Sequence, residues 1–356
     1  MSRVFFSVIT LLFLSACSGG GGGGGGGNGG GEVPVSQVEV AVVPELDFVL
    51  MGAPIDLQNI QADFASDISY GDDAANKFDI FMPESATPTP LVIFIHGGGF
   101  TGGDKNSTYS SGPDKIRQVL STGAAFASIN YRLLSTAIDN EGVIKSLGDS
   151  RRALQFIRYY AQSFNIDPTK VAAYGNSAGA GTSIWLATAD EIADSNAADL
   201  VLTQSSRILA AGATETQSTY DLVKWETVVY IDTDFDITLE GLVSSAAGLA
   251  QRLLNFYGIT GLDDLYSPAI VDYRAEVDML GLMDATDAPL WINNSKRSAL
   301  APADVGALLH HPLHAKVLLD QAQAVGLENV VNIPELGIAS ASTEEVIEFL
   351  LRHLGL

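Results

Sequence analysis

Cysteine is nearly absent from the sequence, since Cys17 is the one example in 356 residues. The chain can therefore form no intramolecular disulfide, and it has no set of cysteines that could bind a metal ion. Basic residues are also few, with 19 Lys and Arg against 42 Asp and Glu and a formal net charge of -23. A surface this acidic repels nucleic acid and anionic lipid head groups and favours neutral or cationic partners. We expect no nucleic-acid partner and no metal.

No hydrophobic run at the start of the chain is long enough to span a membrane. The largely apolar run Val4 to Leu14 follows the basic residue Arg3 and is shorter than the ~20 residues that a membrane-spanning helix needs. Residues 1–16 are therefore typical of a signal peptide. The next tetrad, Leu14-Ser15-Ala16-Cys17, resembles the bacterial lipobox, which implies that Cys17 becomes the lipidated first residue of the mature protein. The alternative is an ordinary secretory signal that is cut near Ala16.

Residues 18–31 consist almost wholly of glycine, with Ser18 and Asn28 as the exceptions. Because glycine has no side chain to bury, this segment predicts a flexible tether that holds the folded body roughly 20 Å from the anchor. In the lipoprotein family, Ser18 behind the cysteine is compatible with sorting to the outer membrane. We therefore expect an exported protein that reaches the membrane through Cys17. The oligomeric state is not indicated by any pattern.

The rest of the chain has the composition of a large globular domain, with 47% hydrophobic and 17% charged residues. Short apolar runs alternate with helical patterns such as Ser150 to Ala161, which predicts an α/β fold with a mostly parallel central sheet flanked by helices. One domain over residues 32–356 is expected, with a helical cap inserted at about residues 216–287. The predicted strands are Leu91–Ile95, Ala124–Asn130, Val171–Tyr174, Ile208–Ala211, Leu290–Asn293 and Val330–Ile333.

Two glycine-containing motifs predict a catalytic site. Gly175-Asn176-Ser177-Ala178-Gly179 follows a predicted strand and precedes a helical pattern, which is the setting of a nucleophile elbow with Ser177 as the nucleophile. His96-Gly97-Gly98-Gly99-Phe100 follows the strand Leu91–Ile95 and resembles the oxyanion loop of esterases and lipases. The backbone N–H groups of Gly98, Gly99 and Ala178 would then stabilise an oxyanion. A phosphate-binding loop is the alternative, but its glycine spacings are absent.

Residues 64 to 215 resemble the hormone-sensitive-lipase and feruloyl-esterase-like branches of the α/β-hydrolase superfamily. The resemblance implies a serine hydrolase that cleaves carboxylic esters through an acyl-enzyme on Ser177, and it implies no cofactor. It rests on both glycine motifs together with Asp67–Gly71, Phe78–Pro83, Ser128–Leu133, the helix led by Asp149, and Asn165–Pro168.

The usual partners of the serine are missing from their family positions. The resemblance implies an Asp after the strand Leu290–Asn293 and a His after the strand Val330–Ile333. The first loop, residues 294–298, contains no acid, and Ile338 stands where a Gly-His pair would place the histidine. A base and an acid must therefore come from elsewhere in the chain.

Five histidines are available as the base. His353 lies in the last helical segment, and the family's histidine at His96 is more often structural, which leaves His310, His311 and His314. Pro312 suits the first position of a helix and puts His311 at its cap, near the sheet edge where the serine is expected. We predict His311 as the base and Glu335 as the acid, an exchange of the two family loops. Simple capping or packing by these histidines is the alternative, and Asp304 and Glu215 compete as the acid.

The sequence leaves more than one function open. A serine esterase uses both glycine motifs, whereas a non-catalytic binding lipoprotein with the same fold would explain the missing Asp and His. A peptidase has no supporting feature of its own. The ester substrate is not readable, because the predicted cap that would shape its pocket matches no familiar pattern.

Overall fold

The computed structural model describes residues 45–356 apart from residues 236, 242–248 and 296–299. The predicted signal peptide, the lipidation at Cys17 and the glycine tether lie outside the described residues. Residues Val43–Leu356 form one compact unit. In the part of the chain that the structure describes, no helix is both long and apolar enough to cross a membrane.

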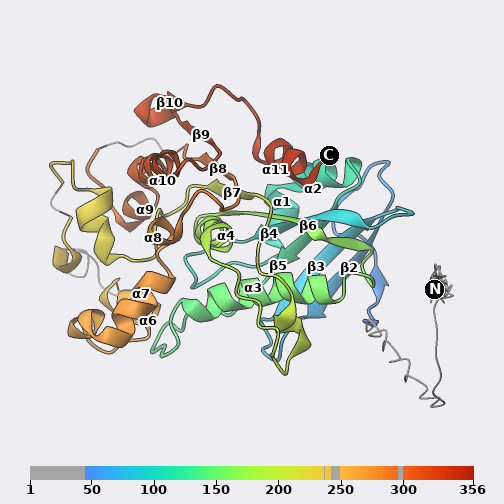
Figure 1. Ribbon diagram of the computed structural model, residues 1–356, viewed down its shortest axis with the longest axis horizontal. Coiled ribbons are helices and arrows are strands. Elements are labelled where there is room, and N and C mark those ends of the chain that lie inside the picture. The colour runs from blue at the N-terminus through green and yellow to red at the C-terminus, as the bar shows by residue number, and fades with distance from the viewer. Residues whose placement is uncertain (1–44, 236, 242–248, 296–299) are drawn as a thin grey trace, which may run out of the picture. The chain divides into compact units, whose positions relative to one another are not determined.

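A ten-stranded sheet runs through this unit in the order β1-β2-β3-β5-β4-β6-β7-β8-β9-β10 (Figure 1). The pairs from β5 through β4, β6, β7 and β8 to β9 are parallel, and antiparallel strands lie at both edges. The predicted α/β-hydrolase fold is thus confirmed. The strands are β1 (Leu50–Met51), β2 (Ala62–Ser69), β3 (Lys77–Pro83), β4 (Thr89–Ile95), β5 (Ala125–Ile129), β6 (Ile166–Asn176), β7 (Ala211–Thr214), β8 (Leu290–Asn293), β9 (Asn329–Ile333) and β10 (Ile338–Ala339).

Helices cover both faces of the sheet, which explains why the central strands are apolar throughout. In β4, Leu91, Ile93 and Ile95 pack into one core layer, whereas Val92 and Phe94 pack into the other. The first layer includes helices α3 (Ile144–Tyr159), α4 (Ala178–Thr188) and α10 (Pro312–Val325). The second includes α2 (Pro113–Ser121) and α11 (Val346–Leu354). Helix α1 (Ser107–Ser111) precedes α2.

Strand β7 begins three residues later than the strand predicted at Ile208–Ala211. Its residues Ala211–Thr214 are small because its neighbours lie close: a Cβ atom on Gly212 would come within 2.4 Å of Val346 and 2.9 Å of Tyr174. An Ala-Gly-Ala-Thr run has little strand character by itself. The apolar residues that suggested a strand lie before it, and Leu209 is 40% exposed.

The segment between β7 and β8, which includes the predicted cap, contains several short helices among its described residues, joined by turns and loops. It contains the π-helical turn η2 (Trp225–Val229), α6 (Leu249–Tyr257), the 3-10 turn η3 (Leu262–Tyr266), α7 (Pro268–Glu276) and α8 (Met279–Leu282). Elsewhere the chain forms the 3-10 turns η1 (Leu200–Thr203) and η4 (Pro334–Leu336), and the short helix α9 (Val305–Leu309) after β8.

Candidate active site

Ser177 lies on the sharp turn between β6 and α4. Its φ of 52° and ψ of -119° are strained for a residue with a side chain. The flanking glycines permit the turn, because a Cβ atom on Gly179 would lie 2.0 Å from the Ile95 carbonyl oxygen. The Ser177 N–H donates to the Thr214 carbonyl at 2.9 Å, which fixes the turn to the end of β7. The geometry is the strand–turn–helix arrangement that the sequence indicated.

The side chain of Ser177 meets His310, which sequence reasoning did not select. Ser177 Oγ lies 2.8 Å from His310 Nε2, and His310 Nδ1 lies 2.9 Å from the Gly306 carbonyl oxygen. A carbonyl oxygen only accepts hydrogen bonds, so Nδ1 carries the proton. Nε2 is then the unprotonated nitrogen, and it accepts the serine hydroxyl proton in a hydrogen bond. This is the tautomer that a general base requires.

The structure does not bring His311 to Ser177. As the sequence indicated, His311 is the N-cap of α10, with Pro312 as the first helical residue. Both ring nitrogens of His311 are occupied. In the cap, Nδ1 accepts from the Leu313 N–H at 3.2 Å, and on the other side of the ring Nε2 donates to the Leu300 carbonyl at 3.1 Å. The side chain is buried, and this burial lowers the pKa of His311. Both ring nitrogens bind backbone groups, so the predicted His311–Glu335 pair is not formed.

Glu335 lies exposed in the turn η4, directly after β9. The two competing carboxylates are also positioned by the fold. Asp304 is the N-cap of α9 and accepts the Ala307 N–H at 2.8 Å. Glu215 follows β7 with a φ of 54°, and its Oε1 accepts from the Ser295 hydroxyl at 3.0 Å.

The loop after β4 lies against the serine turn. A Cβ atom on Gly97 would come within 3.3 Å of Ser177 Cβ. Gly98 has a φ of 111°, and a Cβ atom there would lie 2.1 Å from the Gly102 carbonyl oxygen, so only glycine fits. Gly99 also has a positive φ, of 59°. Ala178 is the first residue of α4, so its N–H has no acceptor within the helix.

His96 has a structural environment. Its Nδ1 lies 2.7 Å from the Gly97 carbonyl oxygen, and its ring stacks on Tyr131 with the centroids 4.4 Å apart. Burial lowers the pKa of His96, so its neutral form is favoured. The histidine thus holds the shape of the glycine loop, as the resemblance implies.

A pocket of about 690 Å³, open solvent at its mouth included, extends from Ser177. Its wall is mainly aromatic and aliphatic, and much of it comes from the helical segment after β7. Arg252 of α6 is an exception, and its Nη2 donates to the Gly99 carbonyl at 3.0 Å. The lining residues are Gly99, Phe100, Ser177, Gln217, Tyr220, Leu222, Trp225, Arg252, Leu253, Phe256, Val305, Leu308 and Leu309.

Comparison with known proteins gives partial matches in sequence and broader matches in fold. Gut esterase 1 of Caenorhabditis elegans is 28% identical over 144 residues, which are 39% of this chain and 25% of that protein. The match thus spans about a quarter of this relative. A truncated carbohydrate esterase from gut microbiota superposes with a TM-score of 0.58 at 14% identity, over 84% of this chain and 99% of that one. The bifunctional GH43-CE protein of Bacteroides eggerthii superposes with a TM-score of 0.55 at 19% identity, over 82% of this chain and 38% of that one.

A family model matches more than half of the sequence. The matched residues, 78–299, begin at the second residue of β3, contain the loop after β4, the serine turn and the strands through β8, and end before His310. This match agrees with the predicted resemblance to feruloyl-esterase-like α/β-hydrolases. The chain belongs to the BD-FAE family.

Proposed function

We propose that the protein is a serine carboxylesterase in which Ser177 is the nucleophile and His310 the base. The observation that carries this proposal is the 2.8 Å contact between Ser177 Oγ and His310 Nε2, with Nδ1 on the Gly306 carbonyl. His310 Nε2 takes the hydroxyl proton as Ser177 Oγ attacks the ester carbonyl carbon. The tetrahedral intermediate collapses, and the alcohol leaves with the proton from Nε2. Water then cleaves the acyl-enzyme by the same steps, with His310 again as base and acid.

Gly98, Gly99 and Ala178 would stabilise the negative charge of that intermediate. Their N–H groups belong to a loop and a helix start that are fixed before substrate arrives, so little reorganisation accompanies the reaction. The start of α4 adds the positive end of a helix dipole close to the reacting oxygen. Support for these roles comes from the positive φ angles of the two glycines and from the contact between Gly97 and the serine turn.

The Gly306 carbonyl would act as an orienting group for His310. A carbonyl cannot donate a hydrogen bond, so it selects the Nδ1–H tautomer and stabilises the imidazolium that forms after proton transfer. Gly306 and His310 belong to the same turn of α9 and its C-cap, so helix geometry maintains this contact. The orientation of the base is thus built into a local element.

Fluorophosphonate labelling tests the dyad directly. We expect wild type to label, Ser177→Ala not to label, and His310→Ala to label more slowly by a factor on the order of 10³ or more. The matched control is His311→Asn, which keeps an N-cap but removes the imidazole, and it should label at a rate close to wild type. A folded wild type that does not label would favour the non-catalytic binding protein, and loss with His311→Asn alone would contradict the role of His310.

We also propose that the protein is exported and anchored to the outer membrane through a lipid on Cys17. The support is the Leu14-Ser15-Ala16-Cys17 tetrad, with the apolar run before it and the glycine segment after it. Expression of the full chain with radiolabelled palmitate should give a labelled membrane protein, and Cys17→Ala should abolish the label. Equal labelling of both would rule out this anchor.

A further inference from the structure

Arg252 carries the one charge among the residues that line the pocket and that the structure describes. Its guanidinium is in hydrogen-bond contact with Gly99, a residue of the loop beside Ser177. The surrounding wall includes the aromatic rings of Phe100, Tyr220 and Phe256. Arg252 and Ser177 line the same pocket, so an ester that reaches Ser177 shares this pocket with the cation.

Helix α6 is fixed so that Arg252 keeps this place. One turn after Arg252, the buried Asn255 accepts the Asp139 N–H at 3.1 Å and donates to the Ser135 carbonyl at 2.7 Å. The Phe256 carbonyl accepts the Val143 N–H at 2.9 Å. These contacts attach the C-terminal half of α6 to the loop before α3.

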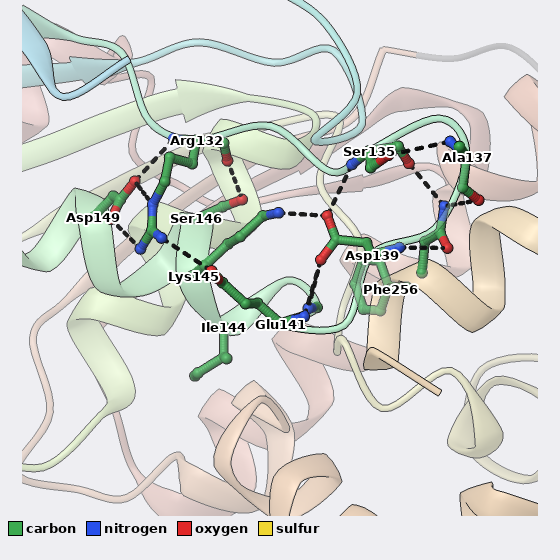
Figure 2. Close-up of polar contacts among 12 residues, drawn as sticks. Arg132, Ser135, Ala137, Asp139, Glu141, Ile144, Lys145, Ser146, Asp149 and Phe256 are labelled. Atoms are coloured by element: carbon green, nitrogen blue, oxygen red, sulfur yellow. Dashed lines mark hydrogen bonds and ion pairs between the residues drawn. The ribbon is translucent and has the colours of Figure 1, made fainter. Parts of the chain in front are cut away.

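That loop is itself held by a charged network (Figure 2). Asp139 accepts from the Ser135 N–H at 2.8 Å and the Gly142 N–H at 3.0 Å, and it pairs with Lys145. Arg132 binds Asp149 and Glu141 in the same region. Because α6 is attached to this loop, the side chain of Arg252 on α6 is preorganised for binding.

The charge of Arg252 has no carboxylate partner among the residues that the structure describes. Its described polar contact is the one from Nη2 to the Gly99 carbonyl, whereas a guanidinium has five N–H donors. The group is partly buried in an apolar wall, and this burial lowers the pKa of Arg252. Cations in such surroundings are usually paired with an anion, and a guanidinium matches a carboxylate with two parallel hydrogen bonds. A carboxylate on the substrate would supply the missing partner.

We propose that Arg252 makes the pocket selective for esters that carry a carboxylate near the scissile carbonyl, such as hemi-esters of short dicarboxylic acids. Hydrolysis of such a hemi-ester with one water gives the dicarboxylic acid and the alcohol. The turnover part of this inference rests on the proposed esterase function, but the binding part does not.

The net charge of -23 opposes the approach of an anion at long range. At physiological ionic strength this field is screened beyond about 8 Å, whereas the guanidinium acts at hydrogen-bond distance inside a mainly apolar pocket. The local contact therefore decides selectivity, and the acidic surface mainly slows entry. Added salt should weaken that repulsion.

Monoethyl glutarate and ethyl glutaramate test the proposal, because the amide is a neutral analogue of nearly the same shape as the carboxylate. The ethanol released is measured to obtain kcat/KM for both esters. We expect wild type to prefer the hemi-ester by about tenfold or more, since charged pairs in apolar sites discriminate strongly. Arg252→Met should bring the ratio of the two kcat/KM values to about one or below. Arg252→Lys should keep part of the preference, and Arg117→Met, which removes a cation of α2 that does not line this pocket, should leave the ratio unchanged.

A second measurement does not depend on catalysis. In Ser177→Ala, monoethyl glutarate should raise the melting temperature more than ethyl glutaramate does, and the additional Arg252→Met change should remove the difference. No preference for the carboxylate in this binding assay would overturn the proposal. If Arg252→Met weakens the binding of both esters equally, the proposal is also overturned, because Arg252 would then only support the position of Gly99. If binding shows the preference but wild type releases no ethanol, the selectivity stands and the esterase proposal fails.

Discussion

A histidine acts as a base only if one ring nitrogen is left unprotonated and faces the reacting group. His310 and His311 are neighbours in sequence but differ in this respect. His310 donates a hydrogen bond from Nδ1 to the Gly306 carbonyl of its own helical turn, and its Nε2 faces Ser177. His311 uses both nitrogens to cap and fasten α10. At the scale of the residue, backbone contacts therefore give one side chain the geometry of the proposed base and the other a structural role.

Gly98 offers a residue-scale prediction. A methyl group at this position would collide with the Gly102 carbonyl, and the φ of 111° is unfavourable for alanine. If the loop supplies oxyanion donors, Gly98→Ala should lower kcat for ester hydrolysis by about 10²- to 10³-fold. Steady-state kinetics with a simple ethyl ester measures this loss.

The control for Gly98 is Gly123→Ala, which has a positive φ of 85° but open space around the new methyl group. It should lower the free energy of unfolding by about 1 kcal/mol and leave turnover intact. Full activity in folded Gly98→Ala would contradict the oxyanion role of this loop.

Much of the candidate site could be predicted from sequence because local geometry determines it. The positive φ angles at Ser177, Gly98 and Gly99 follow from short glycine motifs next to strands. The choice of His310 does not follow in this way. It depends on α9, whose five residues are too few to show a helical period, and on the C-cap position at its end. The family match also ends before this segment.

At the scale of the element, two short helices position the residues on which the two proposals depend. Gly306 of α9 binds the proposed base, His310, and α6 carries Arg252, which binds the Gly99 carbonyl. Leu253 and Phe256 of α6 belong to the first core layer, whereas Leu308 of α9 packs in a separate small cluster with Trp225 and Tyr230. Strand β7 is also difficult to predict from sequence. Its residues are small because Val346 and Tyr174 lie close to it, and such a run does not show a strand pattern.

Asp304 tests whether α9 positions the base. Its side chain caps the helix by accepting the Ala307 N–H. Asp304→Ala should weaken α9 by about 1 kcal/mol and lower kcat severalfold, whereas Asp304→Asn keeps the cap and should keep most of the activity. Progress curves on a neutral ester distinguish the two variants. Were Asp304 the catalytic acid, the Asn variant would lose as much activity as the Ala variant.

Asn255 tests the attachment of α6. Asn255→Ala would remove the partner of the buried Asp139 N–H and of the partly buried Ser135 carbonyl, which costs about 1–3 kcal/mol of unfolding free energy. Chemical denaturation should reveal this loss, together with a weaker preference for the carboxylate ester. The exposed Asn196→Ala should change the unfolding free energy by no more than about 0.5 kcal/mol. Equal stability of the two variants would show that the network does not fasten α6.

At the scale of the whole molecule, a buried histidine links folding to pH. The ring of His314 packs on Trp225 and Tyr230, donates from Nε2 to the Leu308 carbonyl and accepts at Nδ1 from the Ser218 N–H. Burial lowers the pKa of His314 from 6.5 to about 3. In the unfolded chain His314 therefore binds a proton below about pH 6.5, whereas in the folded protein it stays neutral down to about pH 3. Stability must fall as the pH falls through this window.

Between pH 7 and pH 5, this one group should remove about 2 kcal/mol of unfolding free energy. His314→Gln keeps a donor and an acceptor but does not titrate, so its stability should decline less over the same interval. Urea titrations of both proteins at the two pH values give the comparison. An identical decline in the two proteins would show that His314 does not carry the effect.

The contact between Ser177 and His310 joins positions 133 residues apart in the chain. Contacts of such long range form slowly, because closing so large a loop costs entropy before packing compensates it. In a chain that emerges from the ribosome, the turn at Ser177 is synthesised long before His310, the proposed base. Hydrolytic activity should thus be among the last properties to return on refolding, and the growing chain carries Ser177 without its proposed base until residue 310 has been made.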